Sequence, residues 1–513
     1  MTSLSYRPTT SDAAQRHQVS RSSTGAVFSA TVAYGLLAAW WTPRGPITTS
    51  QAVGAVTLSA TLGVVAGLLL RSRWTMLAAP TVFAVTFEIG RSGTSGPLVD
   101  GIHLGNTYGV LAFLSGRGLH GVLALAPMTV GAALGAGAAR RRLGQQQRPG
   151  RRANAGRLTR RTVTAAMCVG LLILLAGLLR PASTAPILAA DGRHLSGSVA
   201  QLARIHVGGH DLAILLRGNS TKSPILLYLA GGPGGSDLGA MRRHGSALER
   251  DFVVATYDQR GSGKSYDQLE PRSTLTLAAA ISDTIAVSNY LRTRFHQDKI
   301  YLVGNSWGSI LGVLAAQQHP ELYQAFVGAG QMVDIRATDR IYYQDTLAWA
   351  RSHNKKSLVA TLLRNGAPPY KDMLKYEPVL NNEQLVYPYD DTMNAESAGG
   401  FSTNLFVREY TLMEQLHNLG AALDVITVLY PQLQDIDFRT SVPELKIPVY
   451  LVQGRYETRG RAEPAQQWFG LLKAPSKKLI TFPTAGHRTL FEQPEQFALF
   501  MESTVQHEAP SPP

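Results

Sequence analysis

Residues 302–312, "LVGNSWGSILG", indicate the fold of this 513-residue chain more clearly than any other stretch. They contain the pattern G-x-S-x-G, with Ser306 between Gly304 and Gly308, and they follow a strand-like run and open a helical one. A strand-to-helix turn of this kind is so tight that glycines flank the serine, whose hydroxyl is left exposed. The pattern alone also occurs by chance, so Ser306 is either a nucleophile or a small residue in a turn.

Strand-like and helical segments alternate on both sides of this stretch. Seven short apolar runs are predicted as buried strands, at 213–218, 224–230, 252–258, 299–305, 325–330, 447–454 and 477–483. Helical patterns occupy 275–296, 307–319, 461–473 and 492–506. This alternation predicts an α/β fold with a largely parallel sheet covered on both faces. Its core is placed at 183–332 and 442–513, and the mostly helical insertion at 333–441 is predicted as a cap.

A serine nucleophile needs a base and an acid that orients the base, and in this fold they follow in the order Ser, acid, His. His487, in "TAGHRTLFEQP", lies just after the last predicted strand, where the base is required. Glu457, in "LVQGRYETRG", follows the preceding strand and is the favoured acid. Asp334, in "GQMVDI" just past the strand before the cap, is the alternative acid.

The glycine-rich turn "LAGGPGGS" (229–236) follows a predicted strand and can present a backbone N–H to an oxyanion. An oxyanion hole uses such preorganised donors, and we assign two of them, Gly232 and the residue after the serine, Trp307. The alternative, a phosphate-binding loop, is disfavoured because no G-K-[ST] follows. No metal or cofactor is expected.

Five motifs resemble, in order and spacing, the prolyl aminopeptidase (proline iminopeptidase) family of α/β-hydrolases: "GGPGGS" (231–236), "DQRGSGKS" (258–265), "GNSWG" (304–308), "GRYE" (454–457) and "AGH" (485–487). The resemblance implies the roles given above to the serine, the base, the favoured acid and the two oxyanion donors. It also implies that Asp258 and Arg260 brace the oxyanion turn.

Two departures from the family pattern concern substrate preference. The family usually has His where Ala230 precedes the G-G-P turn, and Asp where Glu457 stands. Neither change removes a proton-transfer group, so an active enzyme is expected. Aminopeptidases of the family bind the free α-ammonium of the substrate with cap carboxylates. The cap offers four, of which the last two are favoured: Glu383, Glu396, Glu409 and Glu414.

The N-terminal part has a different composition. Residues 1–182 contain 18 Arg, no Lys and three acids, a net charge of +15, whereas residues 183–513 contain 31 Lys and Arg against 32 Asp and Glu. The basic excess therefore lies among long apolar runs, and nucleic acid is not an expected partner. The single cysteine, Cys168, excludes a disulfide within the chain.

Five apolar runs of the region 1–182 are long enough for helices to cross a hydrocarbon core of about 30 Å. They are predicted as membrane spans, rather than as a cleaved signal peptide, at 26–41, 52–70, 74–90, 119–139 and 162–179. The stretch "TYGVLAFL" (107–114) is too short to span and is predicted as an interfacial or re-entrant piece. "GAALGAG" (131–137) has small-residue spacing suited to helix packing.

Arginines set the expected orientation, because loops rich in Lys and Arg stay in the cytoplasm. The loop at 140–161 has nine Arg and no acid, and Arg71 and Arg73 lie between the second and third spans. Both loops and the N-terminal tail are predicted to be cytoplasmic, and five spans then place the domain after Leu179 outside. The Arg-only composition suggests a GC-rich bacterial genome and hence a bacterial cell membrane.

These patterns predict a membrane-tethered serine hydrolase that removes an N-terminal residue, proline among the candidates, from short peptides through an acyl-enzyme. Two alternatives stay open. The same triad can act on an ester, a lactone or another small acyl substrate, because fold does not determine substrate. A catalytically inactive domain in a sensor or transport assembly is disfavoured by the intact Ser–acid–His set. The lipid bilayer is the expected partner, and the oligomeric state stays undetermined.

Overall fold

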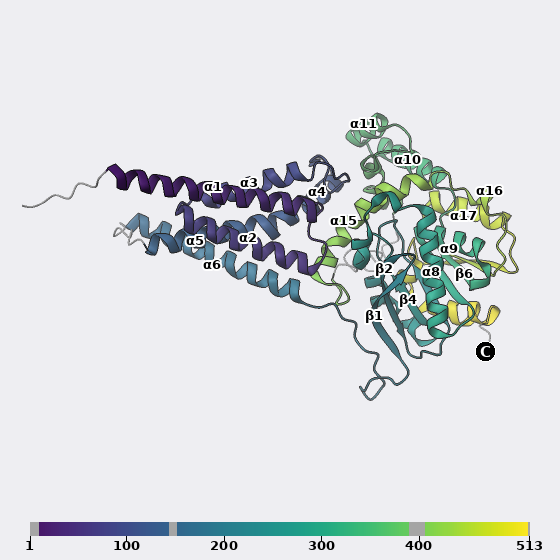
Figure 1. Ribbon diagram of the computed structural model, residues 1–513. Helices are drawn as coiled ribbons and strands as arrows, with labels where there is room; N and C mark the ends of the chain where they lie inside the picture. Colours follow the sequence, from purple (N-terminus) through teal and green to yellow (C-terminus); the bar gives the residue numbers. More distant parts are fainter. Residues whose placement is uncertain (1–9, 143–150, 389–405, 511–513) are drawn as a thin grey trace, which may run out of the picture. The chain divides into compact units, whose positions relative to one another are not determined.

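The computed structural model describes residues 10–142, 151–388 and 406–510 (Figure 1). The chain divides into two compact units, one built mainly from residues up to Arg180 and the other mainly from Pro181 onward. The first unit contains the long apolar helices, and the second contains the sheet and its cap.

The apolar unit consists of helices. They are α1 (Thr10–Trp41), α2 (Thr49–Leu70), α3 (Thr75–Gly90), α5 (Ala126–Arg142) and α6 (Arg151–Leu179). A further helix, α4 (Thr107–Phe113), falls mostly within the second unit. Four helical stretches of the described residues are long and apolar enough to cross a membrane: Arg21–Trp41, Thr49–Leu70, Thr107–Arg142 and Leu158–Leu179.

Two details of the apolar unit differ from the sequence prediction. Helix α3 has only 16 residues, which at about 1.5 Å per residue gives roughly 24 Å, less than the hydrocarbon thickness of about 30 Å. It is therefore a shorter apolar helix and not a fifth span of full length. The stretch 107–114 is not a separate piece, because helical hydrogen bonding continues through π-type turns from Leu114 to Leu125 and joins α4 to α5.

Small residues bring α2 and α5 into close contact. A β-carbon added at Gly131 would lie 2.2 Å from the carbonyl oxygen of Ala60, and one at Gly135 would lie 2.1 Å from that of Val64. Only glycine permits this approach of two helix backbones. The helix-packing role predicted for "GAALGAG" is therefore confirmed.

The second unit is built on one eight-stranded sheet in the order β1-β2-β4-β3-β5-β6-β7-β8. Its strands are β1 (Val199–Val207), β2 (His210–Gly218), β3 (Ile225–Leu229), β4 (Val253–Tyr257), β5 (Ile300–Asn305), β6 (Tyr323–Ala329), β7 (Val449–Gly454) and β8 (Lys477–Phe482). β2 pairs antiparallel with β1 and β4, and every other neighbouring pair is parallel. The predicted α/β fold with a largely parallel sheet is confirmed.

All seven predicted strands form, and β1 is an eighth that the sequence analysis missed. β1 is an edge strand, and only Ile205 and Val207 of its side chains are buried. A half-exposed edge strand carries polar residues, so it lacks the continuous apolar run of a central parallel strand.

Helices cover both faces of this sheet (Figure 1). They are α7 (Leu238–His244), α8 (Leu277–Phe295), α9 (Trp307–Gln318), α17 (Arg459–Leu471), α18 (Thr489–Glu492) and α19 (Pro494–Phe500). Tyr228 and Tyr301 of one face share a buried apolar cluster with Phe491 of α18. On the opposite face Phe326 lies so close to α9 that a β-carbon at Gly312 would be 2.3 Å from its ring.

The cap follows β6 and is mostly helical, as predicted. Its described helices are α10 (Ile335–Ser352), α11 (Lys356–Asn365), α12 (Glu377–Leu380), α13 (Glu383–Val386), α15 (Leu412–Leu429) and α16 (Phe438–Ser441). Helix α15 packs onto the glycine-rich turn after β3, because a β-carbon at Gly234 would lie 2.8 Å from Cβ of Val425.

Candidate active site

Ser306 occupies the turn between β5 and α9 in a conformation that few non-glycine residues adopt, with φ +55° and ψ −122°. Its N–H donates to the carbonyl of Ala329 at 3.0 Å. The flanking glycines are sterically required: a β-carbon at Gly304 would lie 2.4 Å from the carbonyl oxygen of Gly308, and one at Gly308 would lie 2.1 Å from that of Leu229. Strain of this kind costs about 1–3 kcal/mol and is typical of functional sites.

His487 and Glu457 form a close pair in which the acid is buried and the imidazole is partly exposed. Nδ1 of His487 lies 2.6 Å from Oε2 of Glu457, whose side chain is 1% exposed. Oε1 of the same carboxylate accepts the backbone N–H of Thr458 at 2.9 Å. Burial by itself raises the pKa of Glu457, but the charge and hydrogen bond of His487, with Arg461 and the Thr458 N–H, outweigh it and lower the pKa to about 2. The acid is therefore ionised and holds the imidazole by its Nδ1 side.

Asn305 and Gly330, which the sequence analysis did not single out, bring the histidine loop to the serine turn. Nδ2 of Asn305 donates to the carbonyl of His487 and to that of Ala329, both at 3.2 Å. Gly330 has φ +54°, and a β-carbon there would lie 2.7 Å from Nδ1 of His487. The position of Asn305 directly before the serine, and that of Gly330 directly after β6, could have indicated these roles from the sequence.

The serine hydroxyl is directed toward Met332, with Oγ 3.6 Å from the thioether sulfur. Met332 is buried, so the serine hydroxyl lies against an apolar side chain of the protein.

Asp334 does not orient His487. It caps α10, where its carboxylate accepts the N–H of Ala337 at 2.8 Å and pairs with Arg439. Both interactions belong to the start of the cap, so the structure pairs Glu457, and not this alternative acid, with the histidine.

The oxyanion turn lies beside the serine. A β-carbon at Gly231 would be 3.4 Å from Cβ of Ser306. The N–H of Gly231 donates to Asp237 at 3.0 Å, and the hydroxyl of Tyr228 donates to the same oxygen at 2.9 Å. The other oxygen of Asp237 pairs with Arg488, the residue after His487. Asp237 thus holds the turn that contains Gly232 and ties it to the histidine loop, a role that the sequence analysis missed.

Gln259 also joins the oxyanion turn to the serine turn. Its Oε1 accepts the indole N–H of Trp307 at 2.8 Å, and its Nε2 donates to the carbonyl of Ala230 at 3.2 Å. Trp307, whose backbone N–H is the second assigned oxyanion donor, is fully buried. The bracing expected of "DQRGSGKS" therefore passes through Gln259.

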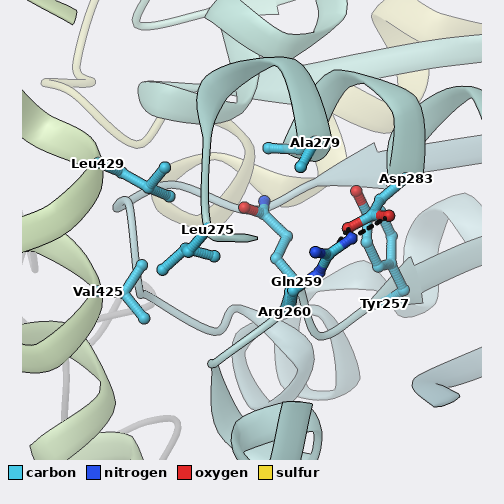
Figure 2. A pocket seen from close by; sticks show the side chains of 9 residues that line it. Tyr257, Gln259, Arg260, Leu275, Ala279, Asp283, Val425 and Leu429 are labelled. Atoms are coloured by element: carbon cyan, nitrogen blue, oxygen red, sulfur yellow. Dashed lines mark hydrogen bonds and ion pairs between the residues drawn. The ribbon is translucent and has the colours of Figure 1, made fainter. Parts of the chain in front are cut away.

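The two bracing residues named from the resemblance behave differently. Asp258 accepts the hydroxyl of Ser236 at the end of the glycine-rich turn and the N–H of Lys264 at 2.8 Å. Burial raises the pKa of Asp258 to about 6, against the opposing effect of these hydrogen bonds. Arg260 turns away: Figure 2 shows it paired with Asp283 of α8, at 2.7 Å, across a small cavity from α15. Arg260 therefore fastens α8, and its hydrogen bonds within the described residues go to Asp283 and Thr274 rather than to the glycine-rich turn.

The cap carboxylates are paired with cations of the protein itself. Glu409 is buried and lies 3.1 Å from Nε of Arg242. Glu414 lies 2.7 Å from Nζ of Lys264, and Glu383 lies 3.1 Å from Arg461. Glu396 lies outside the described residues. The role of Glu409 and Glu414 in binding a substrate ammonium stays a prediction, and in this structure each carboxylate is paired with a basic side chain of the protein.

Comparisons with known proteins place this geometry in a family. A model of the family described as serine aminopeptidase, S33, matches residues 239–494. A probable aminopeptidase of Bacillus subtilis (strain 168) is 30% identical over 322 residues, which cover 60% of this chain and 98% of that protein. A probable proline iminopeptidase of Leptolyngbya boryana is 30% identical over 296 residues, 53% of this chain and 83% of that protein. A solved proline iminopeptidase-related protein from Thermus thermophilus is 18% identical, with a TM-score of 0.42 over 61% of this chain and 99% of that chain.

The Bacillus relative is matched over nearly its whole length at 30% identity. The family resemblance read from the five motifs is therefore confirmed, and the chain belongs to the S33 serine aminopeptidase family of α/β-hydrolases.

Proposed function

We propose that this hydrolase is a membrane-anchored serine aminopeptidase that removes the N-terminal residue from short peptides, with proline among the candidate residues. The observation that carries the proposal is the pairing of His487 with the buried Glu457, on a loop that Asn305 ties to the turn where Ser306 is held at φ +55°. Relatives named as a probable aminopeptidase and a probable proline iminopeptidase support the choice of substrate class.

The reaction uses only side chains and backbone groups of this chain. Ser306 Oγ leaves Met332 and attacks the substrate carbonyl carbon, while Nε2 of His487 accepts the hydroxyl proton. The N–H groups of Gly232 and Trp307 donate to the oxyanion. Collapse breaks the C–N bond, and His487 gives its proton to the leaving amine. Water then attacks the acyl ester and passes a proton to His487, which returns it to Oγ of Ser306 as the ester C–O bond breaks and the acid leaves.

The proposed location is the bacterial cell membrane, with the N-terminus in the cytoplasm and the hydrolase outside. The Arg-rich loop before α6 supports the cytoplasmic side of that helix. An outside hydrolase also requires an odd number of crossings, and hence that the short helix α3 crosses together with the four longer ones.

A second candidate, an esterase or lactonase with the same triad, is favoured by one observation. The three described cap glutamates considered for a substrate ammonium are each paired with Arg or Lys of the protein. An ester substrate without an ammonium group needs no such carboxylate.

The test uses the full-length chain in detergent, beside Ser306→Ala. Free and N-blocked aminoacyl-p-nitroanilides are compared with p-nitrophenyl esters, and labelling by a fluorophosphonate is followed in parallel. Cleavage of free but not blocked amides, lost with Ser306→Ala, is the expected result. Ester turnover alone would establish the second candidate. No turnover and no labelling at Ser306 would refute both.

A further inference from the structure

The carboxylate of Glu457 contacts two partners at once. Oε2 faces His487 at 2.6 Å, while Oε1 lies 3.2 Å from a guanidinium nitrogen of Arg461, one turn along α17. The guanidinium also lies over the ring of Tyr342 from α10, with its carbon 5.1 Å from the ring centroid. Arg461 is only 12% exposed.

The same guanidinium nitrogen reaches the cap. It lies 3.1 Å from Oε1 of Glu383 on α13. A chain of alternating charges therefore runs from the cap to the base, in the order Glu383, Arg461, Glu457, His487. Burial lowers the pKa of Arg461, but Glu383, Tyr342 and Glu457 outweigh burial and keep it well above its usual value, so the cation is permanent.

We infer that Arg461 is a positioning residue for the proposed triad, which seats Glu457 and sets the pH at which His487 becomes a base, with Glu383 of the cap moderating its charge. This inference rests on the proposed function. A cation beside the acid reduces the attraction that Glu457 exerts on the protonated imidazole, and therefore favours its neutral form. An anion beside that cation has the opposite effect.

Other titratable or charged groups also surround the pair. They are Tyr342 on α10, Asp237 and Arg488 of the turn and histidine loops, and Glu492 of α18, which accepts the N–H groups of Gly486 and Arg488. These groups are the same in every variant below, so changes between variants report Arg461 and Glu383.

The experiment measures the rate of fluorophosphonate labelling of Ser306 against pH, in full-length protein in detergent. Because the base must be neutral, the acid limb of this profile follows the imidazole. Arg461→Met should move the limb to higher pH by about one unit. Glu383→Gln should move it to lower pH, because the charge of Arg461 is then less compensated. Opposite shifts from two neighbouring sites are not expected of merely structural damage.

Two further variants separate charge from geometry. Arg461→Lys keeps the positive charge but loses the planar guanidinium that contacts both carboxylates. The acid limb of the labelling profile should therefore stay near its wild-type pH, while the maximal labelling rate falls. Arg459→Met is the matched control: this arginine of the same helix pairs with Asp345 and Glu463 and is 46% exposed. It should leave both limb and plateau unchanged.

The outcomes distinguish this inference from the proposed function. If the wild type is labelled but the acid limbs of Arg461→Met and Glu383→Gln do not shift in opposite directions, the inference about Arg461 is wrong while the proposed function stands. A wild type that is not labelled at any pH overturns the proposed function. In that case the ring of His487 is titrated by NMR in the wild type and in both variants. Opposite shifts of its titration midpoint in Arg461→Met and Glu383→Gln would support the inference about Arg461, and the absence of such shifts would overturn it.

Discussion

At Gly330 the imidazole of His487 occupies the space that a side chain would need. A β-carbon there would lie 2.7 Å from Nδ1, and the backbone has φ +54°. Gly330→Ala should therefore displace the ring and reduce the labelling rate of Ser306 by roughly 100-fold, because a shift of about 1 Å in a reacting group costs that much. Thermal unfolding and labelling are measured on the same sample.

The control for this change is Gly366→Ala, at the end of α11. Gly366 also has a positive φ, +73°, but no atom lies within 4 Å of its added β-carbon. Its backbone, with φ +73° and ψ −175°, lies in a region that favours glycine, so Ala should cost roughly 1–3 kcal/mol of stability and leave activity intact. Equal activity in both variants would mean that His487 is not held against Gly330.

Glu457 is the second residue whose contacts predict a measurable result. Glu457→Gln keeps the size of the side chain but removes the charge that holds His487, and should lower kcat by about 10³–10⁴-fold, as loss of the acid does in other triads. Glu457→Asp keeps the charge but cannot reach His487 and Thr458 together, and should cost roughly tenfold. A Gln variant with wild-type kcat would show that another group orients the base.

At the scale of secondary-structure elements, the contact between α2 and α5 depends on glycines that bring no side chain into the interface. A β-carbon at Gly63 would lie 2.1 Å from the carbonyl oxygen of Met128, whereas one at Gly54 of the same helix meets no atom within 4 Å. Gly63→Val should destabilise the helical unit by about 1–3 kcal/mol, and Gly54→Val should change its stability by less than about 0.5 kcal/mol. Thermal unfolding of both variants in one detergent checks the difference. Equal midpoints would contradict the packing described for these helices.

Sequence patterns predicted the elements of the α/β unit better than those of the apolar unit. Buried parallel strands such as β5 are continuous apolar runs, which are visible without a partner. The edge strand β1 forms by pairing with β2, and its polar side chains interrupt the apolar run by which a strand is recognised in the sequence. The join of residues 107–114 to α5 was missed because glycines at 116 and 118 are typical of a helix end, although here the hydrogen bonding continues through them.

At the scale of the whole molecule, the proposed orientation of the chain in a membrane depends on α3. Five crossings put the C-terminus outside, whereas four would return it to the side of the N-terminus. Alkaline phosphatase fused after Pro513 should be active, and green fluorescent protein fused at the same place should be dark. Fluorescence with inactive phosphatase would mean that α3 does not cross, and would overturn the proposed orientation.

Local patterns of apolar residues and short motifs were enough to predict the fold class, the family and the candidates Ser306, Glu457 and His487. Which side chains meet became known only from the folded chain. Folding paired Glu457 rather than Asp334 with His487, turned Arg260 toward Asp283, placed Gln259 and Asp237 behind the oxyanion turn, and neutralised Glu409 and Glu414 with Arg242 and Lys264. These pairings join residues up to 167 positions apart. Local sequence does not specify which of several acids the folded chain brings to a given base.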